Sequence, residues 1–252
     1  MNDHREQMNV VIVGHVDHGK STVIGRLLAD TGSLPEGKLD AVKAMCARNA
    51  RPFEYAFLLD ALKDEQAQGI TIDTARSFFK SEKRDYIIID APGHIEFLKN
   101  MVTGAARAEA ALLVIDAHEG IRENSKRHGY MMSFLGIKNI TVCINKMDLV
   151  EFSEARFEEI KKQYLEFAKD LNIKSIEFLP ISALRGDNVV DQSKDMPWWK
   201  GKTLLGFLEE VEIESKEEET HPRFPVQYVI RPQTTEHHDY SCLLYTSPSP
   251  RD

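Results

Sequence analysis

The sequence predicts an α/β fold with a mainly parallel β-sheet and helices on both faces. Short apolar runs of strand length alternate with longer stretches of helical spacing, which is typical of consecutive βα units. Polar or glycine-containing loops follow several of the predicted strands. Because right-handed crossovers bring the ends of parallel strands to one edge of the sheet, we expect these loops to form a ligand-binding edge.

Most of the predicted strands are short runs rich in valine, isoleucine and leucine, as expected for strands buried on both faces. They are expected at Val10–Val13, Thr74–Lys80, Tyr86–Asp90, Ala110–Asp116, Ile140–Asn145 and Ile176–Leu179. The predicted helices show apolar residues at three- and four-residue spacing. They are expected at Val23–Leu28, Phe53–Leu62, Ile95–Gly104, Asn124–Leu135, Ser153–Leu171 and Thr203–Val211.

Two of these regions carry further expectations. Ser153 is a candidate N-cap, and the helix that follows it should place five large apolar residues on or near one side: Phe157, Ile160, Tyr164, Leu165 and Phe167. Asp30–Gln68 reads as a long irregular insertion that contains glycines and prolines. Such an insertion is usually functional or mobile, although its apolar part, Phe53–Leu62, is also consistent with core packing.

Composition restricts the class of protein. The chain has 252 residues, of which 42% are hydrophobic and 29% charged, and its net charge is −8. These values suit one globular domain, or one domain and part of another. No basic face stands out, so direct DNA or RNA readout is not expected. Three cysteines without a CxxC pair indicate neither a disulfide framework nor a zinc site, and Cys143 reads as a buried thiol.

The location is expected to be cytoplasmic. The first residues are charged and lack the apolar stretch of a secretory signal. The longest apolar runs, such as Ala110–Ile115, are far too short to span a bilayer. We therefore expect no membrane partner.

The last part of the chain differs from the first 211 residues. Residues 212–220 form an acidic run that reads as a linker, and residues 221–240 read as the start of a truncated second, β-barrel domain. Arg223–Ile230 should be its first strand. Residues 241–252 continue no structural pattern, and their back-translation resembles a transposase-based sequencing adapter, so we expect them not to be native.

The phosphate-binding loop is the most specific motif. Gly14–Ser21 fits G-x-x-x-x-G-K-[ST], with a predicted strand before it and a predicted helix after it. The glycines allow the backbone N–H groups to point inward, and the helix N-terminus adds partial positive charge. Lys20 should reach the β- and γ-phosphates, and the Ser21 hydroxyl should hold Mg²⁺.

Further short motifs follow this loop in a fixed order. The sequence resembles the G domain of translation-factor-type GTPases, a P-loop NTPase fold, at Gly14–Ser21, Thr71, Asp90–His94, Asn145–Asp148 and Ser182–Ala183. The resemblance covers roughly Met8–Val211. It implies GTP and Mg²⁺ as ligands and residues 1–211 as the GTP-binding domain.

The resemblance also implies how the base is selected. The Asp148 carboxylate would accept hydrogen bonds from guanine N1–H and the 2-amino group, which adenine does not offer. Asn145 would brace the loop, and the Lys146 stem would lie along the base. The loop at Ser182–Leu184 would donate a backbone N–H to guanine O6. Sites built on such paired polar groups discriminate by roughly 10⁴–10⁵.

The γ-phosphate would be sensed by two segments. In the family, the threonine matching Thr71 ligates Mg²⁺ only with GTP bound, and the aspartate matching Asp90 holds Mg²⁺ through water. Gly93 would donate its N–H to the γ-phosphate. His94, which follows Asp-x-Pro-Gly, matches the catalytic histidine that orients the attacking water.

The implied site can be stated as two sets. The nucleotide contacts are Gly14, His15, Val16, Asp17, His18, Gly19, Lys20, Ser21, Thr22, Gly93, Asn145, Lys146, Asp148, Ser182, Ala183 and Leu184, and the Mg²⁺ ligands are Ser21, Thr71 and Asp90. The side chains of His15, His18, His118 and His128 are expected to be structural or solvated, and the role of Asp17 stays open.

Two families within this superfamily fit the chain. It resembles the GTPase (large) subunit of sulfate adenylyltransferase at Glu54–Asp60, Gly69–Asp73, Gly186–Val190, Met196–Trp199 and Arg223–Val229. That resemblance implies GTP hydrolysis that drives formation of adenylyl sulfate by a small ATP-cleaving partner subunit.

The alternative family is the translation elongation factors of 1-alpha/Tu or selenocysteine-specific type, which carry aminoacyl-tRNA to the ribosome. This chain is closer to elongation factor 1-alpha at Asp90–His94 and Phe97–Met101. At position 91, for example, the sulfurylase subunit usually has threonine. Met196-Pro-Trp198 is shared by both families. The start of the second domain favours the sulfurylase subunit. Trp198 and Trp199 read either as core or as interface.

Overall fold

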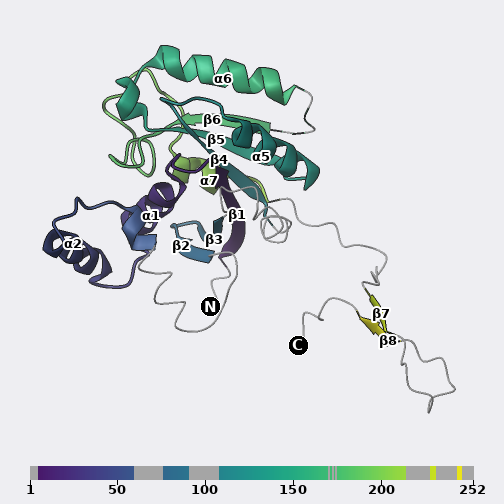
Figure 1. The fold of residues 1–252 in the computed structure, drawn as a ribbon, viewed down its shortest axis with the longest axis horizontal. Coiled ribbons are helices and arrows are strands. Elements are labelled where there is room, and N and C mark those ends of the chain that lie inside the picture. Colours follow the sequence, from purple (N-terminus) through teal and green to yellow (C-terminus); the bar gives the residue numbers. More distant parts are fainter. Residues whose placement is uncertain are drawn as a thin grey trace. The chain divides into compact units, whose positions relative to one another are not determined.

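The computed structural model describes residues 5–59, 76–90, 108–169, 171, 173 and 175–213, with the backbone of residues 228–230 and 243–245. The chain divides into two compact units, Met1–Ile213 and Glu214–Asp252. Figure 1 shows the elements of both units with their labels. The first unit contains the phosphate loop, Asp90, Asn145–Asp148 and Ser182–Ala183.

A six-stranded sheet forms the centre of the first unit, with strand order β2-β3-β1-β4-β5-β6. The strands are β1 (Glu6–Gly14), β2 (Arg76–Lys80), β3 (Arg84–Asp90), β4 (Ala110–Asp116), β5 (Asn139–Asn145) and β6 (Ser175–Pro180). All neighbours pair in parallel except β2, which lies antiparallel to β3 at the edge. The predicted, mainly parallel sheet is therefore confirmed.

Register places the strand ends at one edge. Ile12 of β1 lies opposite Asp90 of β3, and Gly14 lies opposite Val114 of β4. Asp116, the last residue of β4, lies opposite Asn145, the last residue of β5. Each of these strands therefore releases its loop at the same edge, as parallel pairing requires.

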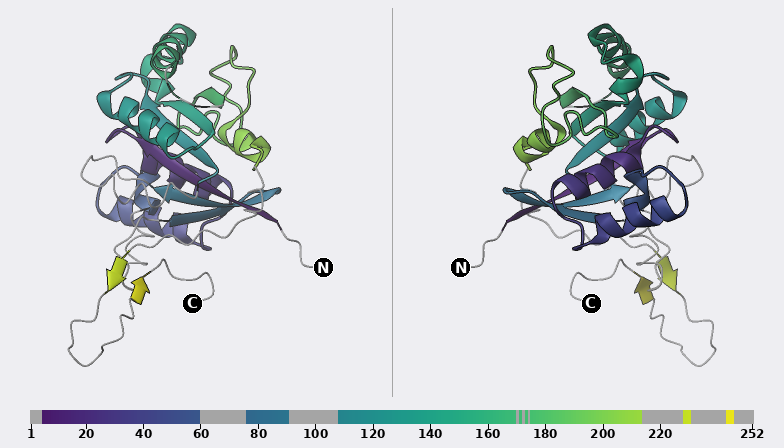
Figure 2. Two further views of the ribbon diagram at one scale, coloured as in Figure 1. Left: turned by 90° about the vertical axis from the view of Figure 1, so that its right-hand side faces the viewer. Right: turned by 90° about the vertical axis from the view of Figure 1, so that its left-hand side faces the viewer.

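Alternate residues of the central strands face two separate apolar clusters. Val10 and Ile12 pack with helices α1 (Lys20–Asp30) and α7 (Leu204–Glu210). Val11 and Val13 pack on the other side with α5 (Glu123–Phe134) and α6 (Glu154–Ala168). Figure 2 shows α5 and α7 on opposite sides of the sheet. Helices on both faces are thus confirmed.

Helix α6 begins as the sequence indicates. The Ser153 hydroxyl accepts the backbone N–H of Arg156 at 3.3 Å, which satisfies one unpaired donor of the first turn. One expectation was wrong, because the helix ends at Ala168 instead of Leu171. Leu165, expected on or near the apolar side, is 42% exposed. Trp198 and Trp199 are half-buried and pack against Phe157 with ring centroids 5.4 and 5.6 Å away.

The insertion after α1 was wrongly expected to be irregular up to Phe53. It contains helix α2 (Lys38–Arg48), which begins after Gly37 at a positive φ of 75°. Val42 and Cys46 of this helix form a small cluster with Leu58. Residues 53–55 are not helical, but residues 56–59 have the expected helical structure, and Leu58 and Leu59 are buried.

The second unit is described only in two short strands. Tyr228–Ile230 forms β7, which pairs antiparallel with β8 (Leu243–Tyr245). β7 lies inside the strand expected at Arg223–Ile230, and β8 lies inside the segment expected to be adapter-derived. The helix expected at Ile95–Gly104 lies outside the described residues. In the described part of the chain, no helix is long and apolar enough to cross a bilayer.

Candidate nucleotide-binding site

The phosphate loop joins β1 to α1 in a conformation that depends on two glycines. Gly14 has a φ of 153°, and a Cβ there would lie 2.5 Å from the carbonyl oxygen of Val114. Gly19 has a φ of 92°, and a Cβ there would lie 2.5 Å from the Asn145 side-chain nitrogen. Larger residues at these positions would displace backbone or a buried amide, so both approaches require glycine.

The start of α1 is suited to an anion. Its N-cap is Gly19, which provides no side-chain hydrogen bond, and the first turn contains no acidic residue. The partial positive charge of the helix N-terminus is therefore not neutralised locally. Ser21 and Thr22, in the first turn, are partly buried.

Lys20 is held inside the curve of the loop. Its Nζ donates hydrogen bonds to the carbonyl oxygens of Gly14 and His15, both at 2.9 Å. Burial lowers the pKa of Lys20, and the nearby carboxylates of Asp90 and Asp17 oppose that shift. A partly buried ammonium held mainly by carbonyl oxygens favours an incoming anion, because the anion restores the lost solvation.

Asn145 joins the phosphate loop to the base-recognition loop. Its Nδ2 donates to the carbonyl oxygen of His18 at 2.9 Å, and its Oδ1 accepts the backbone N–H of Ala183 at 3.0 Å. The side chain is 2% exposed. A planar amide can make both bonds at once because it carries a donor and an acceptor on the same group. The bracing role of this residue stays a prediction, and these are the two contacts through which it would act.

The predicted base-recognition residues lie together beside this amide. The Ser182 hydroxyl donates to Asp148 Oδ1 at 2.6 Å, which orients the carboxylate. Ser182 and Ala183 are buried, whereas Leu184 is 55% exposed. Lys146 has a left-handed φ of 61°. Sequence motifs far apart along the chain are thus brought to one sheet edge.

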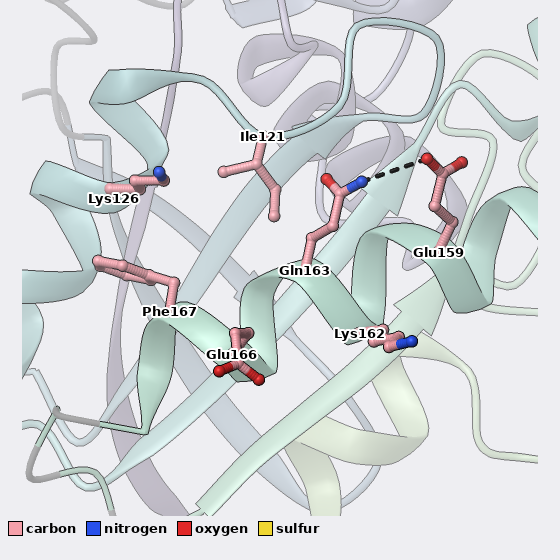
Figure 3. A pocket seen from close by; sticks show the side chains of 7 residues that line it. All are labelled: Ile121, Lys126, Glu159, Lys162, Gln163, Glu166 and Phe167. Atoms are coloured by element: carbon pink, nitrogen blue, oxygen red, sulfur yellow. Dashed lines mark hydrogen bonds between the residues drawn. The ribbon is translucent and has the colours of Figure 1, made fainter.

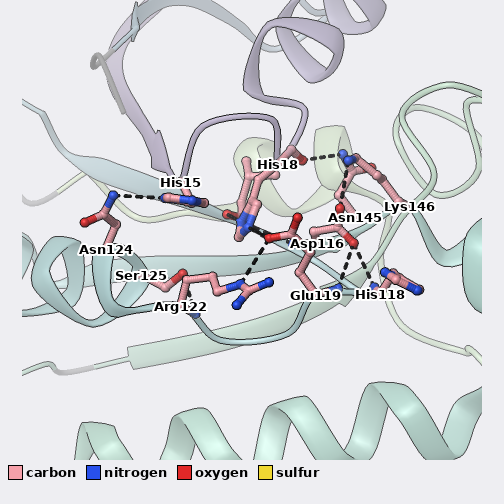
Figure 4. A network of polar contacts seen from close by, with 12 residues as sticks. His15, His18, Asp116, His118, Glu119, Arg122, Asn124, Ser125, Asn145 and Lys146 are labelled. Carbon is pink, nitrogen blue, oxygen red and sulfur yellow. Dashed lines mark hydrogen bonds and ion pairs between the residues drawn. The ribbon is translucent and has the colours of Figure 1, made fainter. Parts of the chain in front are cut away.

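His18 is fully buried under the phosphate loop. Its Nδ1 lies 3.2 Å from the Val114 carbonyl oxygen and 3.3 Å from the backbone nitrogen of Asp116. Its Nε2 lies 3.4 Å from the Glu119 carboxylate. Burial lowers the pKa of His18, against raising contributions from Val114, Glu119 and Asp116. The predicted structural role of this side chain agrees with its position (Figure 4).

The sequence motifs contain no sign of Asp116, which lies in the same network. Its carboxylate is 2.7 Å from Lys146 Nζ. The sequence showed only that the fourth strand ends at this residue. The signal that identifies it is register, since Asp116 pairs with Asn145 across β4 and β5 and so lies beside the next residue, Lys146.

Two other histidines are His15, within the phosphate loop, and His128 of α5, whose pKa is affected by Lys20, His15 and His18 of that loop. His15 Nδ1 accepts the Asn124 side-chain amide at 2.9 Å. His128 is 3% exposed and its Nδ1 has no hydrogen-bond partner among the described residues. Burial lowers the pKa of His128 to about 4, with smaller contributions from Lys20, His15 and His18. His128 is therefore neutral at physiological pH.

The predicted γ-phosphate-sensing residues are only partly described. Asp90 ends β3 beside β1. Thr71, Gly93 and His94 lie outside the described residues. Within the described ranges no cluster of three histidine, cysteine or acidic side chains could hold a metal. A Mg²⁺ ion that also uses phosphate oxygens needs no such cluster. Asp90 lies near enough to Lys20 to raise its pKa, and Ser21 follows Lys20 in the loop, so their oxygens suit such an ion.

A separate surface cavity lies between α5 and α6. Seven side chains line this cavity (Figure 3): Ile121, Lys126, Glu159, Lys162, Gln163, Glu166 and Phe167. None of these residues belongs to the motifs, and the lining carries both charge signs. The cavity is therefore not part of the nucleotide site.

Relatives with known names match most of the chain. "Sulfate adenylyltransferase subunit 1" of Bacteroides thetaiotaomicron is 47% identical over 233 residues, which is 91% of this chain and 48% of the relative. The protein of the same name from Colwellia psychrerythraea is 44% identical, over 91% of this chain and 50% of the relative. The chain thus spans about half the length of these curated relatives.

Two solved structures have a similar fold. Sup35 complexed with GMPPNP matches with a TM-score of 0.59 and 27% identity, over 83% of this chain and 46% of that chain. The Ski7 GTPase-like domain of S. cerevisiae, bound to GTP, matches with a TM-score of 0.69 and 20% identity, over 92% of this chain and 56% of that chain. The second likeness concerns the fold alone.

The family model described as "Elongation factor Tu GTP binding domain" matches residues 5–214. This range contains the sheet, its flanking helices and the described loops that carry the motifs. The chain therefore belongs to the elongation factor Tu GTP-binding domain family.

Proposed function

We propose that this chain binds GTP with Mg²⁺ and hydrolyses it to GDP and phosphate. The Asn145 amide carries the proposal, because it connects the loop that would hold the phosphates to the loop that would read the base. Lys20 and the N-terminus of α1 would bind the phosphates. Asp148, oriented by Ser182, would accept the two guanine N–H groups, as in the resemblance described above.

Hydrolysis would require a water molecule to attack the γ-phosphorus while the bond to the GDP oxygen breaks. Mg²⁺, when bound, would supply charge neutralisation for the β- and γ-phosphates. Ser21, Asp90 and Thr71 would hold it. Lys20 would stabilise the charge that develops on the phosphate oxygens. His94 would orient the water, and Gly93 would donate its N–H to the γ-phosphate.

We further propose that this GTPase regulates sulfate adenylyltransferase in sulfate assimilation. Relatives of that name at 44–47% identity over 91% of the chain support the proposal. A small subunit that forms adenylyl sulfate from ATP and sulfate would be the partner. The two described cysteines, Cys46 and Cys143, are unpaired and buried, which fits a cytoplasmic location.

The test combines two assays on the full chain. Fluorescent GDP should bind and be displaced by GTP but not by ATP. With the small adenylyltransferase subunit, ATP and sulfate present, GTP should increase adenylyl sulfate formation, and sulfate should stimulate phosphate release from GTP. A chain that binds GTP but stimulates nothing would contradict the sulfate role alone.

The alternative is an elongation factor that delivers aminoacyl-tRNA, suggested by Asp90–His94 and Phe97–Met101. Protection of the aminoacyl ester bond from hydrolysis by the GTP-bound chain would favour it. A matched incubation with uncharged tRNA and GDP provides the control.

A further inference from the structure

The end of β4 is the point at which the phosphate loop is attached to the sheet. The backbone of Gly14 packs against the Val114 carbonyl oxygen. His18 contacts the backbone of Val114 and Asp116 and the side chain of Glu119. Any residue in this short segment that also contacts the base-recognition loop would connect the two halves of the site.

Asp116 makes that second connection. Its Oδ2 lies 2.7 Å from Lys146 Nζ, and its Oδ1 accepts the backbone N–H groups of His118 at 2.7 Å and Glu119 at 3.2 Å (Figure 4). Asp116 is 3% exposed, and both of its carboxylate oxygens have partners. Its orientation is therefore fixed before any ligand arrives.

The electrostatics show that the carboxylate is kept charged. Burial alone would raise the pKa of Asp116, but the Lys146 ammonium and the N–H groups of Glu119 and His118 outweigh burial and lower it. A buried carboxylate with a lowered pKa needs its cation, because removing one partner leaves an uncompensated charge. Lys146 is thus held by a permanent counter-charge.

The turn that carries the N–H donors is itself supported from α6. Arg156 Nε donates to the Ala117 carbonyl oxygen at 2.8 Å, and its Nη2 donates to the His118 carbonyl oxygen at 3.2 Å. The turn after Asp116 therefore does not depend on the aspartate alone. Because Arg156 also holds the turn, the contact between Asp116 and Lys146 can be tested without loss of the turn.

We propose that Asp116 is a positioning residue that holds the Lys146 side chain as a preformed wall for the guanine base. The inference rests on the proposed guanine-nucleotide function. A lysine side chain loses much rotamer freedom when it is ordered. With Asp116 present, that cost is met on folding and not on nucleotide binding, so the bound nucleotide dissociates more slowly.

The discriminating variant is Asp116→Asn. The asparagine oxygen can still accept the two turn N–H groups, but its NH₂ group would face the Lys146 ammonium, donor against donor. We expect fluorescent GDP to dissociate about 10- to 30-fold faster, the factor that corresponds to the rotamer entropy of one ordered lysine. Glu158→Gln, which removes a 2.9 Å ion pair with Lys161 on the surface of α6, is the matched control and should leave dissociation unchanged.

A double-mutant cycle separates positioning from general destabilisation. Lys146→Met keeps the stem and removes the ammonium, so adding Asp116→Asn to it should not accelerate dissociation further. The inference would be overturned if the effects of the two substitutions on the GDP dissociation rate multiplied in the double variant. It would also be overturned if the dissociation rate of the single Asp116→Asn variant lay within twofold of that of the natural chain. The double variant also covers the case in which Asp116→Asn alone fails to fold, because it contains no opposed donors.

A nucleotide-free measurement completes the test. Brief acetic anhydride treatment followed by peptide mass spectrometry should label Lys146 several-fold faster in Asp116→Asn than in the natural chain, relative to Lys161. Equal labelling would contradict the proposed contact. If the natural chain bound no GDP, the proposed function would fail, while this labelling would still decide whether Asp116 holds Lys146.

Discussion

Replacing Asn145 by alanine tests whether one amide organises the nucleotide site. The change removes hydrogen bonds to the His18 carbonyl oxygen and from the Ala183 N–H, each worth about 0.5–1.5 kcal/mol. It also leaves a buried N–H unpaired, at a cost of about 1–3 kcal/mol. Together these give a loss of about 2–6 kcal/mol. If this loss falls on binding, the Kd for GDP rises roughly 30- to 30,000-fold.

The measurement is equilibrium binding of fluorescent GDP, with thermal unfolding of the ligand-free protein in parallel. Asn188→Ala is the matched control. Asn188 is equally buried and also makes two such bonds, to the Pro180 carbonyl oxygen and from the Ser193 N–H, but it belongs to no nucleotide motif. It should lower the melting temperature and leave the Kd unchanged. A Kd within threefold of the natural value in Asn145→Ala would refute the bracing role.

The remaining predictions concern packing, base choice and pH. Gly25→Ala should destabilise the domain by about 1–3 kcal/mol in urea unfolding, because a Cβ would lie 2.1 Å from the Tyr55 carbonyl oxygen. Gly206→Ala should cost less, because its nearest neighbour is the Thr203 side-chain oxygen at 3.3 Å. Asp148→Asn should shift preference from GTP toward xanthosine triphosphate, since the hydrogen-bond pattern reverses; unchanged nucleotide competition would contradict this. Burial holds the pKa of His128 at about 4, against 6.5 in the unfolded chain, so the unfolded chain binds the proton first as pH falls. Stability should decline by about 3 kcal/mol between pH 6.5 and 4, and His128→Gln should lack this part of the decline; an equal decline in both would exclude His128 as its source.

The strands were predictable because strands buried on both faces read as continuous apolar runs. Ala110–Asp116 has the bounds expected for it. Helix α2 was missed although Leu39, Val42 and Cys46 recur at helical spacing, because this apolar face is short and only Val42 and Cys46 are buried. Its neighbours Pro35 and Gly37 also suggested a loop.

Parts of the site were predictable to different degrees. The phosphate loop and the base-recognition motif are local in sequence, so their residue types and spacing identify them. The Asp116–Lys146 contact joins residues 30 positions apart and depends on how β4 pairs with β5. Only the strand register brings these two side chains together, and composition or spacing contains no trace of it.

The amide of Asn145 has a consequence for how a nucleotide would be recognised as a whole. The amide fixes the spacing between the phosphate loop and the predicted base-recognition loop. A nucleotide would therefore bind as a bivalent ligand, with the base and the triphosphate as its two binding groups and the ribose as the linker. Once one of these groups is bound, the other is presented to its own loop at a high effective concentration. Guanosine and inorganic triphosphate, added together but unlinked, should therefore bind far more weakly than the intact nucleotide.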